Sequence, residues 1–404
     1  VAQTPLVSSF VNTTERCTQT TTVLEKAPET TKSACVSLQP GGTRPTRLQF
    51  IQHSLRKQGF SEPTAHRMSH KTRDSTNCLY QSYWDRFYLW CIARGHNPNL
   101  PTVQILADYL NYLFEVKQYK PQAIEGVKSS LSQAFLLSGV LDVTQNPQLS
   151  ALLRNFTLTC PADRFQLPKW NLNLVLAMLM SAPYEPICDI PMRELTLKTC
   201  FLLSLASAAR CSEMHSISYS LLSHSPGWTH VWLQPHAHFL AKNQTSRALN
   251  QRRSFKVQSL VNFAGPDLPD RKLCPVRALR LYLAKTESRR QKQKQKSLFL
   301  SMRPTRGKEI SKSCIALWLR TVIKEAHTNC TNDQMQFARA TPHEVRAIAS
   351  SLAFNHSLSL SSILDNCTWK SESTFTSFYL RDLSRQFPDH VALQPCVVAG
   401  TVVK

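Results

Sequence analysis

Acidic residues are scarce in this sequence of 404 residues. Asp and Glu together number 26, against 48 Lys and Arg, and the formal net charge is +22. Most soluble enzymes lie nearer neutrality, so this imbalance favours a polyanionic partner. At this length the chain can form two ordinary domains whose cores need no disulfides.

Long apolar runs and paired cysteines are also missing. No uninterrupted apolar stretch approaches the roughly 18 residues that a membrane span requires, and no basic and then apolar secretory leader opens the sequence. The 13 cysteines are scattered singly without a CxxC pair, and their odd number does not fit a complete disulfide framework. We therefore expect a soluble protein of a reducing, intracellular compartment, with no membrane partner.

Positive charge is concentrated in one segment. Between Arg271 and Glu325 there are 16 Lys and Arg but only three acids. Such a surface can bind a duplex by neutralising phosphates and releasing counterions. It can also be a solvated face that only keeps the protein soluble, and charge alone does not decide between the two.

Two domains are predicted behind a leader. Residues 1–74 are rich in Thr, Ser, Pro and Gln with weak periodicity, which predicts a flexible leader with at most one short helix, at 48–58. A helical domain is predicted at 75–165, because apolar residues recur at helical spacing between short Pro or Asn turns. Its helices are expected near 77–91 and at 102–117, 121–138 and 148–158.

The segment Cys160 to Pro168 contains two prolines and reads as a linker into a second domain at 166–388, with a tail at 389–404. This second domain is predicted to be mainly helical with one small β-sheet. Helices are expected at 172–181, 192–209, 275–286 and 310–326, and from Pro342 and Glu372 onward. Strands are expected between 229 and 260, in "HVWLQPH", "HFLAKNQ" and "SFKVQSL".

A group of chemistry-bearing residues begins at Thr341. Thr341 and Glu344 have the spacing of a capping box, and Pro342 suits the first helical position, so a helix is predicted to start here. His343 and Arg346 then share one face near free backbone N–H groups and the positive end of the helix dipole, which favours an anion. Taken alone, the segment more often marks an ordinary surface helix.

Two further cations lie earlier in the chain. An apolar helix over 197–209 delivers Arg210 at its end, and Glu213 can pair with this arginine while leaving donors for a phosphate oxygen. A structural ion pair is the alternative. Lys242 in "HFLAKNQT" is placed where a short strand meets a turn, from which it can reach a leaving oxygen or simply face water.

A late helix is predicted to carry Phe375, Phe378 and Tyr379 on one face. By itself such a stripe is typical of core packing. A tyrosine is almost wholly protonated at neutral pH, so it becomes an effective nucleophile only with help from nearby cations.

Taken together, these residues resemble the tyrosine recombinase (phage integrase) family. The family signature is two arginines, a lysine on a β-hairpin, a His-x-x-Arg helix start, a His or Trp, and a tyrosine on a late helix. The candidates follow the family order: Arg210, Lys242, His343, Arg346, Trp369 and Tyr379, with Glu213 where the family supports the first arginine. The hairpin varies in length, so Lys256 is an alternative to Lys242.

The closer resemblance is to the recombinases of DIRS-type and Ngaro retrotransposons. It covers roughly residues 59–383, and the leader before it has no match in this family. The segments that carry it are "PKWNLNLVLAMLMSAPYEP", "ASAARCSEMHSI", "LCPVRALRLYL", "RAIASSLAF" and "STFTSFYLRD".

The resemblance implies a helical core-binding (SAM-like) domain at 75–165 and a catalytic domain at 166–388 that grip double-stranded DNA as a C-shaped clamp. It implies DNA cleavage and rejoining through a 3′-phosphotyrosine at Tyr379, without ATP, cofactor or metal, in order to integrate a retrotransposon DNA circle. The two arginines and His343 would hold the phosphate oxygens, Trp369 would add a hydrogen bond or packing, and Lys242 would protonate the leaving oxygen. A homotetramer would assemble on two duplexes.

Other functions stay open. Cys367 and Thr368 before Trp369, and Glu344 and Val345 after His343, stand where relatives carry other, smaller residues, so a catalytically decayed or domesticated DNA-binding protein is one alternative. A type IB topoisomerase-like nicking enzyme and a basic structural protein are the others. The pair His236 and His238 is expected on one face of a strand, and because further ligands are lacking we interpret it as structural.

Overall fold

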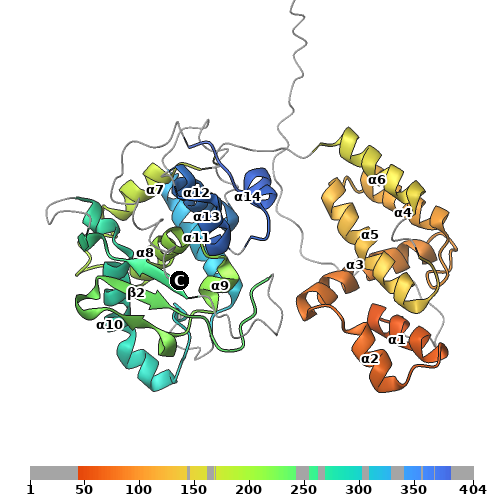
Figure 1. Cartoon of the computed structure of the whole chain (residues 1–404), viewed down its shortest axis with the longest axis horizontal. Helices are drawn as coiled ribbons and strands as arrows, with labels where there is room; N and C mark the ends of the chain where they lie inside the picture. Colours follow the sequence, from red (N-terminus) through yellow and green to blue (C-terminus); the bar gives the residue numbers. More distant parts are fainter. Residues whose placement is uncertain are drawn as a thin grey trace, which may run out of the picture. The chain divides into compact units, whose positions relative to one another are not determined.

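The computed structural model describes residues 44–142, 146–161, 168, 170–242, 254–262, 269–302, 309–328, 341–355, 358–367 and 369–383. The chain divides into two compact units, Val1–Ala162 and Asp163–Lys404 (Figure 1). Helices predominate in both units, and the second also contains a small antiparallel sheet. The predicted class, mainly α with a small β-sheet, is confirmed. None of the helices in these ranges is long and apolar enough to cross a membrane.

The first unit packs its helices around an aromatic core. Trp84, Phe87 and Phe135 are fully buried at its centre, and Trp84 stacks on Phe50 with ring centroids 4.9 Å apart. Aromatic side chains bury large apolar areas, so these contacts help to hold the bundle together. The helices are α1 (Arg47–Lys57), α2 (Glu62–Ser69), α3 (Asp74–Ile92), α4 (Val103–Glu115), α5 (Pro121–Ser138) and α6 (Pro147–Thr159).

The predicted leader at 1–74 is too long. Helices α1 and α2 precede residue 74, and α1 buries Phe50, Ile51 and Leu55 in the same core as Trp84. Thr46 caps α1 by accepting the backbone N–H of Gln49. A few well-spaced apolar residues therefore outweigh the polar composition that surrounds them. Residues 1–43 of the predicted leader, most of the linker and the tail at 389–404 lie outside the described residues.

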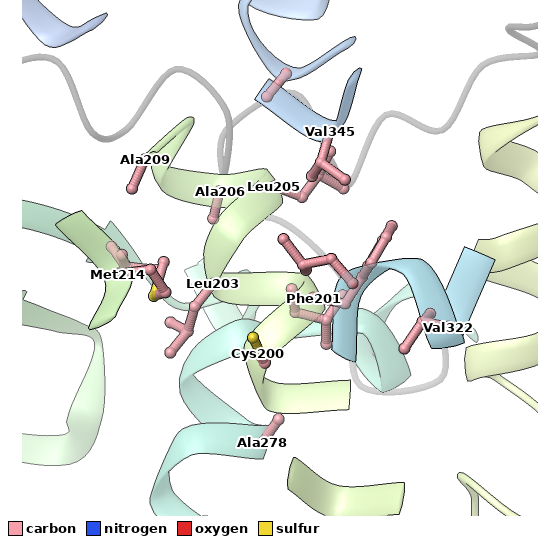
Figure 2. Packing of buried hydrophobic residues seen from close by; sticks show 14 of the residues in the cluster. Cys200, Phe201, Leu203, Leu205, Ala206, Ala209, Met214, Ala278, Val322 and Val345 are labelled. Atoms are coloured by element: carbon pink, nitrogen blue, oxygen red, sulfur yellow. The ribbon is translucent and has the colours of Figure 1, made fainter. Parts of the chain in front are cut away.

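The second unit is built around helix α8 (Met192–Ser207), which is buried on all sides from Leu195 onward. Figure 2 shows its side chains meeting Met214, Ala278, Val322 and Val345, each from a different neighbouring helix. Because α8 is surrounded, its C-terminal end is held firmly in place. The other helices are α7 (Leu172–Leu179), α9 (Cys211–His215), α10 (Pro275–Gln293), α11 (Lys312–Ala326), α12 (Pro342–Asn355), α13 (Leu360–Cys367) and α14 (Glu372–Phe378).

Three short antiparallel strands form the sheet in the order β1 (Ser223–His224), β2 (His230–Leu233) and β3 (Phe255–Gln258). Two of the predicted strands correspond to β2 and β3. The third, "HFLAKNQ", is wrong for its described residues 238–242, which form a turn and irregular backbone. The preceding segment explains this, because Gln234 and His236 bond to the backbone of Ser218 and Ser216 instead of forming a hairpin. His238 therefore lies in a turn and not on a strand.

Helix α10 continues to Gln293, seven residues beyond its predicted end. Arg290 accounts for the extension, because its side chain is only 3% exposed and donates to the carbonyls of Ser297 and Leu298. These bonds fasten the last turn of the helix to the chain that follows it. A residue counted as surface charge in the sequence is therefore internal.

Candidate active site

Arg210 is positioned by the turn between α8 and α9. Helix α8 ends at Ser207, and Ala208 is left-handed (φ 47°), so the chain turns sharply before Arg210. A left-handed alanine costs about 1–2 kcal/mol, and the surrounding contacts must compensate for it. The backbone N–H of Arg210 donates to Glu213 Oε2 (2.7 Å) and its Nη1 donates to Oε1 (2.8 Å). The structure thus contains the pairing that the sequence predicted.

Glu213 also joins Arg210 to Arg346. The Arg346 side chain on α12 is 1% exposed, and its Nη1 donates to Glu213 Oε2 (3.3 Å) and to the carbonyl of Ala208 (2.9 Å). Its Nη2 donates to the carbonyl of Cys367. One buried carboxylate therefore serves two guanidinium groups, and the cluster keeps a net positive charge that an anion can neutralise.

Two buried donors beside this cluster have no hydrogen-bond partner among the described residues. They are Nε of Arg346 and Nε1 of Trp369. The two side chains are in contact, with the Arg346 guanidinium carbon 4.9 Å from the centre of the Trp369 ring. A buried donor without a partner costs about 1–3 kcal/mol. The pair therefore marks a place where an anion rich in oxygen atoms can accept hydrogen bonds.

His343 occupies the first turn of α12 and is solvent-exposed as a residue. Neighbouring protein nevertheless desolvates its ring and lowers the pKa of His343 below the ordinary 6.5. Arg346, Arg210 and Lys242 lower this pKa further, because each brings positive charge close to the ring. The structure thus brings four of the six predicted site residues into one electrostatic cluster.

The two candidate lysines lie in different surroundings. Lys242 is exposed in a turn, and its charge acts on His343. Lys256 lies on β3 with its Nζ 5.8 Å from the centre of the Trp232 ring, and it lowers the pKa of His230, after the larger effect of desolvation. Of the two lysines, Lys242 is the one that contributes to the lowered pKa of His343.

Trp369 and Tyr379 complete the group. Trp369 follows α13 and is 6% exposed, and Tyr379 ends α14 with its backbone N–H bonded to the carbonyl of Phe375 (2.8 Å). The Trp369 and Tyr379 rings contact each other with centroids 4.4 Å apart. The guanidinium carbon of Arg346 lies 5.8 Å from the centre of the Tyr379 ring. A phenol therefore lies next to the buried cation.

The predicted aromatic face of α14 is only partly correct. Phe375 is fully buried and Tyr379 half-buried, but Phe378 is 62% exposed. The helix ends at Phe378, and Phe375 alone reaches the core, where it stacks on Trp369 (5.5 Å). The stripe is therefore not a simple packing surface, and Tyr379 lies at its boundary with solvent.

The helix start predicted at Pro342 is confirmed, but the capping box predicted between Thr341 and Glu344 is wrong. The backbone N–H of Glu344 donates to the carbonyl of Thr341 (2.9 Å), but the Glu344 carboxylate pairs with Arg381. This ion pair was missed, although the sequence holds one signal for it. Glu344 stands inside the His-x-x-Arg motif, and Arg381 follows Tyr379 by two residues.

Among the described residues, no group of three or more His, Cys, Asp or Glu side chains can hold a metal ion. The donors gathered here are two guanidinium groups, an ammonium, an imidazole and an indole, all of which can donate hydrogen bonds to an oxygen anion. The arrangement can hold a phosphate-like group next to a phenol and a lysine.

Comparisons with known proteins add the following. No family model matches the chain, and no curated protein sequence matches it. Among solved structures, the chain is similar to one described as XerA recombinase, at 14% identity over 89% of this chain and 98% of that one, with a TM-score of 0.35. It is also similar to an integrase from mycobacterium phage Brujita, at 13% identity over 88% of this chain and 94% of that one, with a TM-score of 0.30.

Proposed function

We propose that this chain is a site-specific DNA recombinase of the tyrosine class, which breaks and rejoins DNA through a covalent link to Tyr379. One observation carries the proposal. Segments far apart in the sequence bring Arg210, Lys242, His343 and Arg346 into one cationic cluster, with Trp369 and Tyr379 packed against Arg346. A phosphodiester is the anion that matches both the charge and the adjacent phenol.

In the proposed reaction the phenolic oxygen of Tyr379 attacks a backbone phosphorus atom and loses its proton to solvent. The bond from phosphorus to the 5′ oxygen breaks, and Lys242 supplies the proton to that leaving oxygen. Arg210, Arg346 and His343 hold the non-bridging oxygens as negative charge increases on them, and Trp369 donates from Nε1. Because the phosphotyrosine stores the bond energy, the 5′ hydroxyl of another strand can reverse the step without ATP.

The remaining parts of the proposal concern substrate and assembly. We propose that the helical first unit is a DNA-binding domain that grips the duplex together with the second unit, and that four copies act on two duplexes. The closer resemblance to DIRS-type and Ngaro recombinases supports a retrotransposon DNA circle as the substrate and the nucleus as the location. This resemblance rests on the five sequence segments quoted above.

A nicked, end-labelled duplex with candidate element ends tests the proposal. Cleavage near the nick lets the short fragment with the 5′ hydroxyl diffuse away, so a covalent adduct accumulates if the chain is active. We expect a labelled band that resists denaturant and disappears with protease. DNA binding without any adduct would instead identify a catalytically decayed DNA-binding protein.

A further inference from the structure

The ion pair between Glu344 and Arg381 lies outside the phosphate-binding cluster. Both residues are buried, with 4% and 8% exposure. Arg381 Nη2 donates to Glu344 Oε1 (2.8 Å), and its Nε donates to Oε2 (3.3 Å). The two planar groups therefore meet through two parallel bonds, which fix orientation as well as distance. None of the steps proposed above uses this pair.

The same arginine holds the backbone around the nucleophile. Arg381 Nη1 donates to the carbonyls of Phe378 and Leu380, each at 3.1 Å. Ser351 on α12 provides the remaining contacts, since its Oγ donates to the carbonyl of Tyr379 (3.2 Å) and accepts the backbone N–H of Arg381 (2.9 Å). The carbonyls of three consecutive residues, 378 to 380, therefore all accept hydrogen bonds. The donor is either Ser351 on α12 or Arg381, which is paired with Glu344 on α12.

Resting on the proposed function, we infer that Glu344, Ser351 and Arg381 form a clasp that positions Tyr379 for attack. The clasp matters because α12 also carries Arg346, two residues beyond Glu344. Helix α12 thus carries Arg346, which binds the phosphate in the proposed reaction, and also holds the segment that contains Tyr379. Helix α14 has only seven residues and one fully buried side chain, Phe375, so it cannot by itself set the phenol with the accuracy that attack requires.

This arrangement also implies that Tyr379 serves the active site of its own chain. The clasp joins α12 to the segment after α14 of the same molecule through four hydrogen bonds. Release of the tyrosine toward another copy would break all of them together. These three residues are therefore positioning residues, whose effect on chemistry passes through the location of the phenol.

The substitutions Arg381→Met and Glu344→Gln remove the charges of the pair with little change in volume. We expect the rate of adduct formation to fall about 100-fold, the loss typical of a misplacement of about 1 Å, with DNA affinity within about three-fold of wild type. Ser351→Ala keeps the ion pair and should show a smaller loss, of about five- to ten-fold. Lys198→Met is the matched control, because Lys198 is also a buried cation bound to a glutamate and to backbone carbonyls. It should destabilise the second unit but leave the rate per folded molecule unchanged.

A small nucleophile separates positioning from general structural damage. In the Tyr379→Phe background, hydrogen peroxide can replace the phenol and attack the activated phosphate. We expect Arg381→Met to leave this cleavage unchanged, whereas Arg346→Ala should abolish it. If Arg381→Met abolishes peroxide cleavage as well, the pair supports the whole site and the clasp is refuted. Adduct formation within about three-fold of wild type would refute it too.

Limited proteolysis tests the clasp without any catalytic readout. Phe378 is exposed and next to Tyr379, so chymotrypsin should cut this segment faster when Arg381 or Glu344 is replaced. Unchanged digestion would overturn the clasp. If the wild-type chain forms no adduct on any DNA, the recombinase proposal fails, and the digestion pattern still decides whether these residues hold the segment.

Discussion

Arg210 and Arg346 share one carboxylate but differ in their structural role. Arg346 is fully buried and bonds to three chain segments, at Ala208, Glu213 and Cys367. The Arg210 side chain keeps 11% exposure, and Glu213 stays paired with Arg346 when this side chain is removed. The two substitutions therefore have different consequences for stability even if both arginines hold phosphate.

We predict that Arg210→Ala slows cleavage by about 100-fold or more, because it removes a charge-assisted bond that strengthens in the transition state. The thermal midpoint should change little. Arg346→Ala should lose both cleavage and stability, since it leaves the buried carbonyls of Ala208 and Cys367 without this donor and removes one of the two arginines paired with Glu213. Single-turnover cleavage and thermal unfolding of each variant measure the two effects. Cleavage by Arg210→Ala within a few-fold of wild type would show that this arginine is only structural.

We expect His343 to make both the stability of the chain and its affinity for DNA depend on pH. In the free protein its pKa lies below 6.5, so the folded chain binds fewer protons than the unfolded chain near that pH, and the stability that His343 contributes is lost as pH falls through 6.5. We predict that a bound phosphate offsets the charge of the neighbouring cations and raises the pKa of His343. DNA binding then takes up a proton, and affinity should rise as pH falls through the same range.

Titrations of DNA binding at several pH values, made with wild type and with His343→Gln, test this prediction. The increase in affinity at low pH should be larger in the wild type, because only there does the ring take up the proton. Other histidines contribute equally to both proteins and cancel in the comparison. Parallel curves for the two proteins would place His343 away from the bound phosphate.

At the scale of elements, helix boundaries with strong local signals were predicted well and the others were not. Helix α5 begins at Pro121 and ends before Gly139, which is left-handed (φ 71°), and both ends were predicted. Helix α2 was missed because only Ala65 and Ser69 are buried along its eight residues. The end of α10 was missed because Arg290 is fixed by carbonyls that follow it in the chain.

In the candidate site, too, local features could be predicted from the sequence and long-range contacts could not. The residue types and their order are visible in the sequence, and so is the local pairing of Arg210 with Glu213, three residues apart. The contact between Glu344 and Arg381 spans 37 residues, and no local pattern specifies it. The choice between Lys242 and Lys256 likewise depends on which lysine the tertiary structure brings near His343.

The end of α5 offers a test of the first unit. A Cβ atom at Gly139 would lie 2.8 Å from Gln58 Nε2, which itself donates to the carbonyl of Ser138, and the left-handed backbone adds strain. We predict that Gly139→Ala lowers the free energy of unfolding of this unit by about 1 kcal/mol or more. Gly126→Ala is the control, because it lies inside α5 with only ordinary contact to Tyr83, and it should stabilise by about 0.5–1 kcal/mol. Denaturant titration gives both values, and effects of the same sign would contradict the assigned helix end.

In the whole molecule, the described parts of the basic segment, 271–302 and 309–325, are mostly helical. Arg290 points inward, and Lys292, Lys294 and Lys296 are the exposed cations that surround it. A reversal of charge restricted to these three lysines leaves the last turn of α10 intact. If they contact phosphates, each lost contact should reduce the slope of log affinity against log salt by about 0.9. Binding titrations in the Tyr379→Phe background measure this slope without covalent trapping, and an unchanged slope would assign the three lysines to solvent.

The residue that becomes linked to DNA can be identified directly. Wild-type chain is trapped on nicked duplex DNA, digested with nuclease and protease, and the peptide that carries the residual nucleotide is identified by mass spectrometry. We predict that the nucleotide is attached to Tyr379. The variant Tyr379→Phe should form no adduct although its DNA affinity is nearly normal. The control variant Tyr219→Phe, at a tyrosine bonded to Glu287, should form the adduct normally. A nucleotide on any other residue, or an undiminished adduct from Tyr379→Phe, would contradict the account.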